Sequence, residues 1–283
     1  MKNTLQMPRL SIVIVTYNST GHIDECLRSL VEHRPLVDHD IVVVDNASTD
    51  RTAAAIRARW NGVRVIDAGA NLGFARANNL GIQQTFGELI LLLNPDTSVP
   101  AGAIDSLVAA LDARPDAAIA GPRLVNADGR AELSFGRMMS PLAELRQKVL
   151  VRGSGRSGFI ATYVESITRR EREVDWVSGA CLLVRRADAE AVGLMDERYF
   201  MYAEDVDFCA AVRARGRHVL FSPAAEVIHL RGQSRATASD AAERAYRRSQ
   251  VAFYEKHHPG WARWLRWYLK ITGSLPDNRS GHE

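Results

Sequence analysis

The sequence predicts an α/β fold of the Rossmann-like kind, in which a mainly parallel sheet is flanked by helices. Two patterns within residues 1–115 predict it. Short runs of apolar, largely β-branched residues alternate with longer segments in which apolar residues recur at helical spacing. The runs are almost continuously apolar, as in strands that are buried on both faces. Alternating strands and helices favour a parallel sheet, because a helix is the usual crossover between parallel strands.

The expected elements of this first half follow one another in order. Strands are expected at residues 10–16, 41–44, 63–66 and 89–93. Helices are expected at residues 18–31, 49–60, 74–86 and 100–113. Polar residues that suit a helix start open the first two helices, and Pro100 suits the first turn of the last.

The second half of the chain has a less regular pattern. Residues 130–172 are rich in Arg, Ser and Gly, so we expect a long excursion that contains one helix at residues 142–151. Regular structure is expected to resume at Val174. The elements expected after it are a strand that ends at Val184, a helix at 205–215, short strands at 218–221 and 227–229, and helices at 240–257 and 261–271.

Composition limits the class of protein. The 283 residues suffice for one large α/β domain with a sizeable core, or for a domain with a short appendage. There are 36 Lys and Arg against 33 Asp and Glu, a net charge of only +3, so we expect no nucleic-acid partner. Three cysteines without a CxxC spacing predict packed thiols in a reducing compartment. The first residues lack the apolar core of a signal peptide and no apolar run has membrane-spanning length, so a cytoplasmic location is expected.

Polar clusters follow each of the four expected strands of the first half. In open parallel sheets, ligands bind beyond the carboxyl ends of the strands. We therefore expect the clusters at residues 16–18, 45–48, 69–71 and 94–96 to line one rim of the sheet.

The cluster at Asn94 and Asp96 suits a metal ion. Both residues come just after a buried strand and offer hard oxygen ligands of the kind that magnesium and manganese prefer. Asn, Pro and Asp are also turn residues, so a plain turn is the alternative.

Asp45 ends another apolar strand, and short polar residues follow it. Such a cluster can bind a nucleotide base or ribose through hydrogen bonds. A helix N-cap at Thr49 or Asp50 is the alternative, although a cap does not explain Asp45 itself.

Three carboxylates, Glu204, Asp205 and Asp207, open an expected helix. The positive end of the helix dipole stabilises them, so a solvated helix start is the plain interpretation. Aromatic residues at 199–202 precede them, however, and apolar surroundings can raise the pKa of a carboxyl group and suit it to general-base catalysis.

His229 follows an apolar pair, and Arg231 and Ser234 after it are residue types that can hold a diphosphate. A lone histidine is usually structural. Taken with the other clusters, it indicates a site that combines a metal, a phosphate clamp and a base.

These residues resemble the inverting family 2 glycosyltransferases of the GT-A fold. Seven blocks match in the family's order, which makes the resemblance specific although each block alone is weak. They are IVTYN (14–18), VVDNASTD (43–50), NLGFA with Asn78 (71–78), LNPD (93–96), WVSGA (176–180), MYAEDVD (201–207) and HLRGQS (229–234). Within the family, the sequence is similar to bacterial rhamnosyltransferases that use dTDP-rhamnose in cell-wall and surface-polysaccharide assembly.

The resemblance implies where the donor and the metal bind. Asp96 would be the metal-binding acid of the family's Asp-x-Asp motif, whose first acid is replaced here by Asn94, and His229 would be the second ligand to Mn²⁺ or Mg²⁺. The residues implied at the nucleotide-sugar are Thr16, Tyr17, Asn18, Asp45, Asn46, Ser48, Asn71, Gly73, Phe74, Asn78, Asn94, Asp96, Arg231 and Ser234.

The resemblance also implies the catalytic and acceptor residues. Asp205 would be the base, with Glu204 beside it as an acceptor contact or an orienting group. The residues implied on the acceptor side are Trp176, Ser178, Gly179 and Asp207. The reaction would be one displacement that inverts the anomeric carbon. It would move a sugar, L-rhamnose in the most specific hypothesis, from a nucleotide diphosphate to a glycan or a polyprenyl-diphosphate-linked saccharide.

The implied organisation is a GT-A catalytic domain at 1–238 and a C-terminal helical extension at 239–283. The catalytic domain would divide into a nucleotide-sugar half, 1–115, and an acceptor half, 116–238. The basic, aromatic segment 261–270 can lie in a membrane interface, which would place the protein peripherally on the inner face of the cell membrane. Packing onto the domain or in a homodimer is the alternative.

Two other functions stay open at this point. A nucleotidyltransferase also combines an α/β domain, a nucleotide and a metal, but usually carries a Gly-rich basic loop near the first strand. A non-catalytic sugar-nucleotide-binding protein is the other. A dehydrogenase is not expected, because no GxGxxG follows an expected strand.

Overall fold

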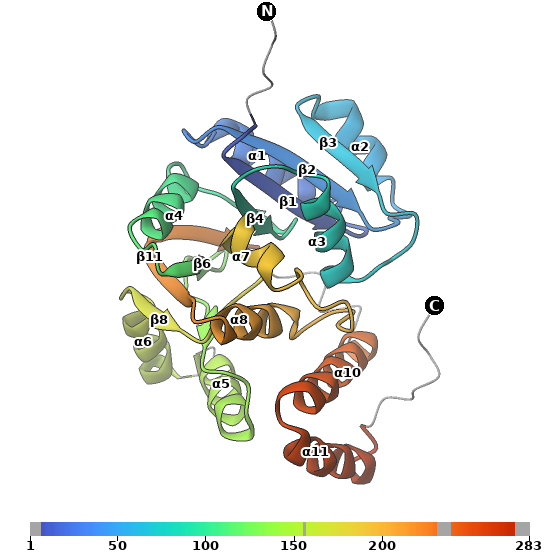
Figure 1. The fold of residues 1–283 in the computed structure, drawn as a ribbon, viewed down its shortest axis with the longest axis vertical. Helices are drawn as coiled ribbons and strands as arrows, with labels where there is room; N and C mark the ends of the chain where they lie inside the picture. Colours follow the sequence, from blue (N-terminus) through green and yellow to red (C-terminus); the bar gives the residue numbers. More distant parts are fainter. Residues whose placement is uncertain (1–6, 155–156, 231–238, 275–283) are drawn as a thin grey trace, which may run out of the picture.

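A nine-stranded mixed sheet runs through the molecule and carries helices on both faces (Figure 1). The structure is a computed structural model and describes residues 7–154, 157–230 and 239–274. The strand order is β3-β2-β1-β4-β10-β6-β11-β5, with β8 paired to β11, and a separate two-stranded sheet joins β7 to β9. The predicted α/β class is confirmed.

The strands are β1 (Leu10–Thr16), β2 (His39–Asp45), β3 (Val63–Asp67), β4 (Leu89–Leu93), β5 (Thr97–Ser98), β6 (Ala117–Val125), β7 (Phe135–Gly136), β8 (Arg172–Val174), β9 (Trp176–Val177), β10 (Cys181–Arg185) and β11 (His218–His229). The helices are α1 (Ile23–Glu32), α2 (Thr52–Arg59), α3 (Phe74–Gln83), α4 (Ala103–Asp112), α5 (Pro141–Ser154), α6 (Gly158–Ile167), α7 (Arg186–Ala191), α8 (Glu204–Ala214), α10 (Ser239–His257) and α11 (Pro259–Ile271).

Strand direction divides the sheet into two parts. The first half of the chain gives the parallel strands β1 to β4, as the strand–helix alternation predicts. In the second half β11 runs parallel to β6, whereas β10 lies antiparallel between β4 and β6. Because β4 and β10 are neighbours, the two halves of the chain share one continuous sheet.

Alternate side chains of the central strands feed two separate cores. On one face, Ile12 and Leu91 pack with apolar residues of α1, α2 and α4. On the other, Val13 and Leu92 pack with residues of α3, α7 and α8. These strands are therefore buried on both faces, which explains why their sequences are continuously apolar instead of alternating.

The central strand β6 is absent from the sequence expectation. Its sequence, AAIAGPRLV, begins with alanines and contains Gly121 and Pro122, which favour a loop. Pro122 is tolerated because the pairing with β10 involves only Ile119 and Ala120, while β11 changes register just beyond Ser222. The same irregularity explains a second difference, since the two short strands expected at 218–221 and 227–229 are one bent strand, β11.

The excursion at 130–172 contains more regular structure than expected. The helix expected at 142–151 is present as α5, but α6 and β7 also lie in this segment, and β8 begins at its last residue. The short elements β5 and α7 were likewise not expected, and α3 ends three residues before the expected position, at Gln83. All of these elements lie at the edges of the sheet or outside it, where sequence periodicity is weak.

The C-terminal helices pack against the rest of the chain through a third core. Phe253 and Tyr254 of α10 and Ala262 of α11 pack with Tyr199 and Val206, which flank the start of α8. The expected domain boundary at residue 238 falls at the edge of a segment outside the described residues. Within the residues that the structure describes, no helix is both long and apolar enough to cross a bilayer.

Candidate active site

Two buried polar side chains lie at the carboxyl ends of β1 and β2. Thr16 and Asp45 are register partners at the last position of these strands, and both are almost fully buried. Asp45 Oδ2 accepts a hydrogen bond from the Ser48 backbone N–H at 3.1 Å. Thr16 Oγ1 and Asp45 Oδ1 have no hydrogen-bond partner in the described part of the chain. Because buried polar atoms normally have partners, these two atoms fit the hydrogen-bonding groups of a ligand.

The loops after β1, β2 and β3 are tied together around these atoms. The Asn18 backbone N–H donates to Ser48 Oγ at 2.9 Å. The Asn46 side chain donates to Asn71 Oδ1 at 2.9 Å and accepts from the Leu72 N–H at 2.8 Å. Three of the four clusters that we expected on one rim are therefore in direct contact.

Gly73 lies at a close approach between the loop after β3 and the loop before α8. Its φ is 79°, and a Cβ there would lie 2.3 Å from the Phe200 carbonyl oxygen. That oxygen accepts a hydrogen bond from the Phe74 N–H at 2.7 Å, so the first turn of α3 is fixed to the loop. The Asn78 side chain donates to the Phe74 carbonyl, a contact inside the helix, so its nucleotide contact stays a prediction. Tyr17 is exposed on the rim.

The fourth cluster meets the end of β11. Asp96 Oδ1 lies 3.3 Å from His229 Nε2, and His229 Nδ1 lies 3.1 Å from Glu132 Oε2. A carboxylate bound to one ring nitrogen orients the other, which is a common arrangement for metal-binding histidines. Burial opposes ionisation of Asp96, but the hydrogen bond and charge of His229 outweigh it and lower the pKa of Asp96. Carboxylate oxygen and imidazole nitrogen are donors that fit Mn²⁺ well and Mg²⁺ less well.

Glu132 is a site residue that the sequence analysis missed. It lies in the excursion at 130–172, where no motif or periodicity singles it out. Its backbone N–H is bonded to the Leu124 carbonyl at the end of β6, so the missed strand is what positions it. Only knowledge of β6 could have drawn attention to Glu132.

A turn holds Asp96 in place. The Asn94 N–H donates to the Ala180 carbonyl at 2.9 Å, and the Asn94 carbonyl accepts from the Thr97 hydroxyl at 2.8 Å. The Leu230 N–H donates to the Asp96 carbonyl at 2.7 Å. The turn that was the alternative interpretation of this motif is thus present, and it is the means by which the carboxylate reaches His229.

Asp205 is held at the start of α8 by two backbone groups. The Gly179 N–H donates to Asp205 Oδ2 at 2.9 Å, and the Val206 N–H donates to Oδ1 at 2.8 Å. Tyr202 and Ala203 just before the helix have left-handed backbones, with φ of 72° and 66°. Such conformations cost about 1–3 kcal/mol each and are found at functional sites.

The two neighbouring carboxyl groups differ in their surroundings. Glu204 is buried, and its Oε2 has no partner among the described residues, whereas Asp205 keeps some exposure. Burial, and then the charge of Asp205, raise the pKa of Glu204 well above its ordinary value. Burial also raises the pKa of Asp205, although its backbone hydrogen bonds oppose the shift. Both carboxyl groups therefore hold a proton more readily than ordinary carboxyl groups do, and burial is the main cause for each.

A cavity of about 250 Å³ opens beside these carboxyl groups. Trp176 of β9, Glu144 and Lys148 of α5 and Tyr246 of α10 contribute to its walls, together with Glu204 and Asp205. The Trp176 indole N–H donates to the Arg137 carbonyl at 2.9 Å, which fixes the ring. The Glu144 carboxylate accepts from the Gln250 side chain at 2.5 Å and from the Tyr254 hydroxyl at 2.8 Å, so α5 and α10 are held together around the cavity.

The loop that carries Ser178 and Gly179 connects this cavity to the rim at the carboxyl ends of the strands. A Cβ on Gly179 would lie 3.3 Å from the Phe74 ring and 3.4 Å from Asp205 Cβ, so the three residues are in contact. Ser178 Oγ accepts from the Ala180 N–H at 3.3 Å, and the Ala180 carbonyl is the group that Asn94 binds. One short loop thus connects Asp205 to the turn that holds Asp96.

Asp207 lies in a different environment from its neighbours. It is 1% exposed. Its carboxylate accepts hydrogen bonds from the Tyr199 hydroxyl at 3.2 Å, from Lys256 Nζ at 2.8 Å and from His257 Nε2 at 2.6 Å. The structure thus gives Asp207 an anchoring contact between α8 and α10, and its expected acceptor contact stays a prediction. Arg231 and Ser234, expected at the diphosphate, lie outside the described residues.

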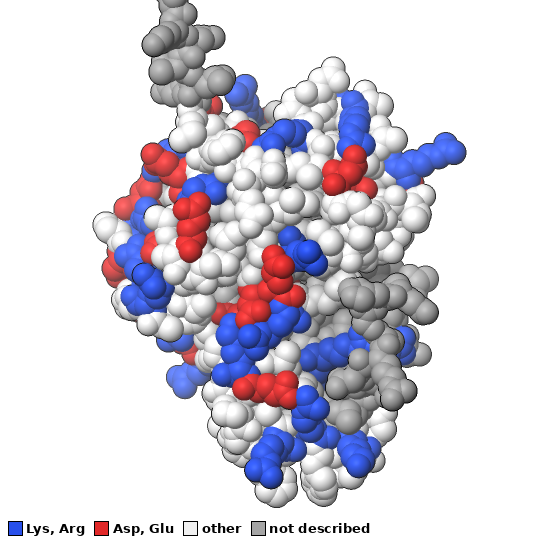
Figure 2. Space-filling view, turned by 45° about the vertical axis from the view of Figure 1, so that its right-hand side comes forward, with Lys and Arg blue, Asp and Glu red and all other residues white. Residues whose placement is uncertain are grey.

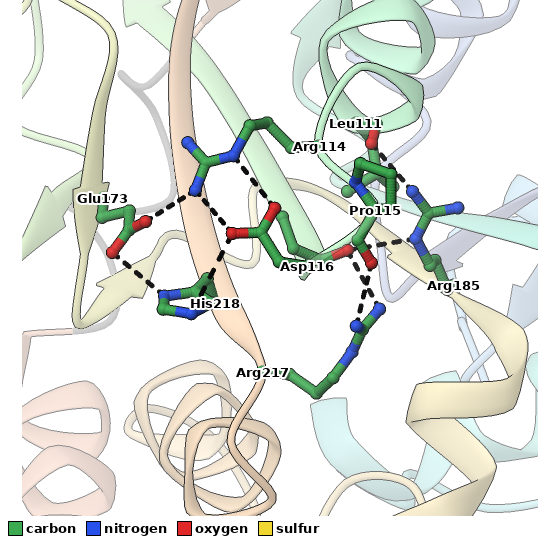
Figure 3. Close-up of polar contacts among 9 residues, drawn as sticks. Leu111, Arg114, Pro115, Asp116, Glu173, Arg185, Arg217 and His218 are labelled. Carbon is green, nitrogen blue, oxygen red and sulfur yellow. Dashed lines mark hydrogen bonds and ion pairs between the residues drawn. The ribbon is translucent and has the colours of Figure 1, made fainter.

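A second cluster of possible metal ligands lies away from this rim. Asp116, Glu173 and His218 offer ligand atoms within 4.8 Å of one another. Arg114 donates to both carboxylates, at 2.8 Å to Asp116 and at 2.6 Å to Glu173 (Figure 3). The guanidinium of Arg114 already pairs with both carboxylates, so this cluster does not need a metal ion to hold the two negative charges together. The cluster also lies at the amino ends of β6 and β11, whereas His229 ends β11, a strand of 12 residues that spans roughly 30–40 Å.

Comparison with known proteins identifies the family. The sequence pattern of glycosyl transferase family 2 matches residues 11–175, more than half of the chain. The chain belongs to glycosyl transferase family 2. The matched segment includes Thr16, Asp45 and Asp96, whereas Asp205 and His229 lie beyond it. Membership of the family confirms the resemblance drawn from the motifs and excludes the nucleotidyltransferase alternative.

Two transferases are similar to this chain over most of its length. The N-acetylglucosaminyl-diphospho-decaprenol L-rhamnosyltransferase of Mycobacterium tuberculosis is 36% identical over 284 residues, which cover 94% of this chain and 90% of the relative. A low-salt glycan biosynthesis hexosyltransferase of Haloferax volcanii is 26% identical, over 78% of this chain and 66% of the relative.

Solved structures confirm the GT-A fold. The mannosyltransferase PcManGT from Pyrobaculum calidifontis, solved with GDP-Man and Mn²⁺, superposes with a TM-score of 0.60 at 18% identity, over 96% of this chain and 77% of that one. The S. aureus protein TarS, residues 1–349, gives a TM-score of 0.57 at 17% identity, over 87% of this chain and 65% of that one.

Proposed function

We propose that this family 2 glycosyltransferase transfers L-rhamnose from dTDP-rhamnose to an N-acetylglucosaminyl-diphospho-polyprenol, with inversion at the anomeric carbon. One observation carries the proposal. Asp96 and His229 meet at the rim that also carries Asp45, and the loop at Gly179 connects that rim to Asp205. The choice of sugar and acceptor is supported by the 36% identity to the rhamnosyltransferase of M. tuberculosis, which spans nearly all of both chains.

The donor nucleotide is placed over the ends of β1 and β2. Thr16 Oγ1 and Asp45 Oδ1 are buried there without partners among the described residues, and they suit the hydrogen-bonding groups of a base and a ribose. The network of Asn18, Asn46 and Asn71 holds the surrounding loops and so preforms this pocket.

Asp96 and His229 would hold the divalent cation. The ring contact with Glu132 keeps His229 Nε2 directed at Asp96, and the low pKa of Asp96 keeps its carboxylate ionised. When bound, the cation supplies a Lewis acid that stabilises charge on the departing diphosphate.

Asp205 is the proposed base. Its backbone hydrogen bonds from Gly179 and Val206 fix the carboxylate and favour its ionised form, while its raised pKa increases its affinity for a proton. Glu204 is more deeply buried, and burial raises its pKa well above the ordinary value, so its role in the proposal is a hydrogen bond to the acceptor beside Asp205. Asp205 removes the proton from the attacking hydroxyl of the acceptor.

The acceptor sugar is placed in the cavity beside Trp176. A larger hollow of about 810 Å³ adjoins this cavity between α5, α6 and β8, and the two share Arg137, Ala143 and Gln147 in their walls. The larger hollow is mostly apolar but also exposes Arg146, which donates to the Tyr163 hydroxyl at 3.2 Å. This combination suits the diphosphate and the first isoprene units of a lipid-linked acceptor.

A transfer assay tests the function. The protein is incubated with Mn²⁺, a synthetic N-acetylglucosaminyl-diphospho-isoprenoid and dTDP-rhamnose, UDP-glucose, UDP-N-acetylglucosamine or GDP-mannose in turn. We expect a rhamnosylated lipid from dTDP-rhamnose alone, with the inverted anomeric configuration by NMR. Transfer from another donor would overturn the choice of rhamnose. Nucleotide binding without transfer from any donor would favour the non-catalytic alternative.

A further inference from the structure

Helix α11 exposes an unusual amount of aromatic surface. Trp261, Trp264, Trp267, Tyr268 and Ile271 are all exposed, and the helix has only 13 residues. Large apolar side chains that are exposed singly are normal, but a cluster of them indicates an interaction surface. Trp264 and Trp267 also contact each other edge to face, with ring centroids 6.0 Å apart.

The rest of α11 is already packed against the protein. Ala262 and Leu269 are buried, and Leu265 packs into the core formed with α10. The helix is therefore fixed in the fold, and the exposed aromatic residues are not the side by which it attaches. They form a separate surface that has no partner among the residues that the structure describes.

Cations are interleaved with the exposed aromatic residues. Arg263, Arg266 and Lys270 are exposed, and no Asp or Glu occurs between Glu255 and Asp277. Arg266 is paired with Glu255, which leaves the charges of Arg263 and Lys270 without a carboxylate partner in the described chain. Figure 2 shows Lys and Arg side chains gathered with uncharged surface at the lower end of the molecule, where Figure 1 places α5 and α11.

The neighbouring helices at this end carry exposed apolar residues as well. Leu142, Leu145 and Val149 of α5 and Phe159 of α6 are exposed. The His258 ring at the start of α11 contacts the Met139 carbonyl just before α5 at 3.0 Å, so the ends of the two helices are joined. Several apolar surfaces thus lie at the same end of the molecule.

We propose that α11 binds the surface of an anionic lipid bilayer, with its tryptophans inserted among the headgroups and its cations facing the lipid phosphates. Indole rings favour the boundary between headgroups and acyl chains, and each unpaired cation adds attraction to anionic lipid. A dimer interface is usually an apolar face with few charges. If two copies of this chain met through α11, Arg263 and Lys270 of one copy would lie close to the same cations of the other and repel them. The proposal stands on α11 alone and does not depend on the sugar, the acceptor or the catalytic residues.

Vesicle flotation tests this surface with the full-length protein. The vesicles are pure phosphatidylcholine, or phosphatidylcholine with 30% phosphatidylglycerol, at 50 and at 500 mM NaCl. The test variant is Trp264→Glu with Trp267→Glu. The two tryptophan side chains are 65% and 57% exposed and are not part of a described core, so their replacement should leave the packing of α11 intact. The matched control is Leu36→Glu with Phe86→Glu, at side chains that are 93% and 65% exposed in the first half of the chain. Both variants change the net charge equally.

We expect the wild type and the control to float with the anionic vesicles at 50 mM NaCl. Both should bind less to pure phosphatidylcholine vesicles, and less to the anionic vesicles at 500 mM NaCl. The Trp variant should lose at least roughly tenfold in partition, since two indoles no longer enter the interface. Circular dichroism and nucleotide binding establish that both variants fold. Equal flotation by the Trp variant, equal loss by the control, or no flotation by the wild type would overturn the proposal. So would a dimer of the wild type in solution that the Trp variant dissolves without any vesicle binding.

Discussion

The change Asp205→Asn tests the proposed base while it alters the site least. The substitution keeps the size of the side chain but removes its ability to take up a proton. General-base catalysis contributes about 10²–10⁴-fold to a rate, which corresponds to roughly 3–5 kcal/mol of barrier. We therefore expect kcat to fall by at least about a hundredfold. The affinity for nucleotide should be unchanged, because within the described residues Asp205 bonds to Gly179 and Val206 and not to Thr16 or Asp45.

The stability of this variant can also be estimated from the contacts. Both carboxylate oxygens of Asp205 accept backbone hydrogen bonds, from Gly179 and Val206. The amide group of Asn would face one of these donors with its NH₂, so about one hydrogen bond, roughly 1 kcal/mol, is lost. Removal of a negative charge beside Glu204 offsets part of that loss. The melting temperature should therefore change by only a few degrees, too little to explain a hundredfold loss of turnover.

Asp207→Asn is the matched control, because it makes the same change two residues further along the same helix. Asp207 binds Lys256 and His257, so Asp207→Asn should lower the melting temperature more than Asp205→Asn does. The kcat of Asp207→Asn should stay near the wild-type value. Single-turnover kinetics at saturating donor and acceptor, with calorimetric binding of dTDP, give both quantities. A variant Asp205→Asn that keeps a tenth or more of the wild-type rate would refute the assignment of the base.

Further predictions concern the metal, the acidic pair and the close approach at Gly73. Chelation by EDTA should stop transfer and Mn²⁺ should restore it, and Asp96→Ala should abolish the restoration; a chelated enzyme with full activity would contradict the role of Asp96. Because the pKa of Glu204 is raised on folding, its contribution to stability is present at low pH and lost as pH rises above about 4.5. Thermal melts from pH 4.5 to 8 should therefore show Glu204→Gln gaining stability over the wild type as pH rises, and a pH-independent difference would show that the carboxyl group is not desolvated. Gly73→Ala should destabilise the fold by about 1–3 kcal/mol more than Gly69→Ala, because both glycines have positive φ but only the Cβ at 73 meets Phe200; equal losses in urea melts would leave backbone strain as the sole cause.

The donor side of the site was largely predictable. Thr16 and Asp45 each end a continuously apolar strand, and parallel strands that are neighbours bring their carboxyl ends to the same rim. Their meeting therefore followed from local sequence and one topological rule. The Asn46–Asn71 contact follows in the same way, because the loops after β2 and β3 leave the sheet side by side.

The part of the site that the second half of the chain builds was less predictable, because it depends on β6 and on the excursion at 130–172. Gly121 and Pro122 made β6 look like a loop, and without β6 nothing places Glu132 beside His229. Tertiary burial overrode the local preference there, since every residue of β6 is buried. The cavity beside Trp176 was unpredictable for a similar reason, as its walls come from α5 and α10, whose contacts are between distant segments.

The sequence by itself determined the fold class, the family and the identities of the polar residues that end each strand, because apolar periodicity and ordered motifs are local properties of the chain. The tertiary structure decided which of those residues act together. Asp205 and Asp207 have the same local setting, as two acids in the first turn of one helix, and only the motif resemblance assigned them different roles. Packing directs Asp205 to the Gly179 loop and the cavity, and it buries Asp207 against Lys256 and His257. A helix turns by about 100° per residue, so side chains two positions apart face different neighbours, and only the assembled fold determines what those neighbours are.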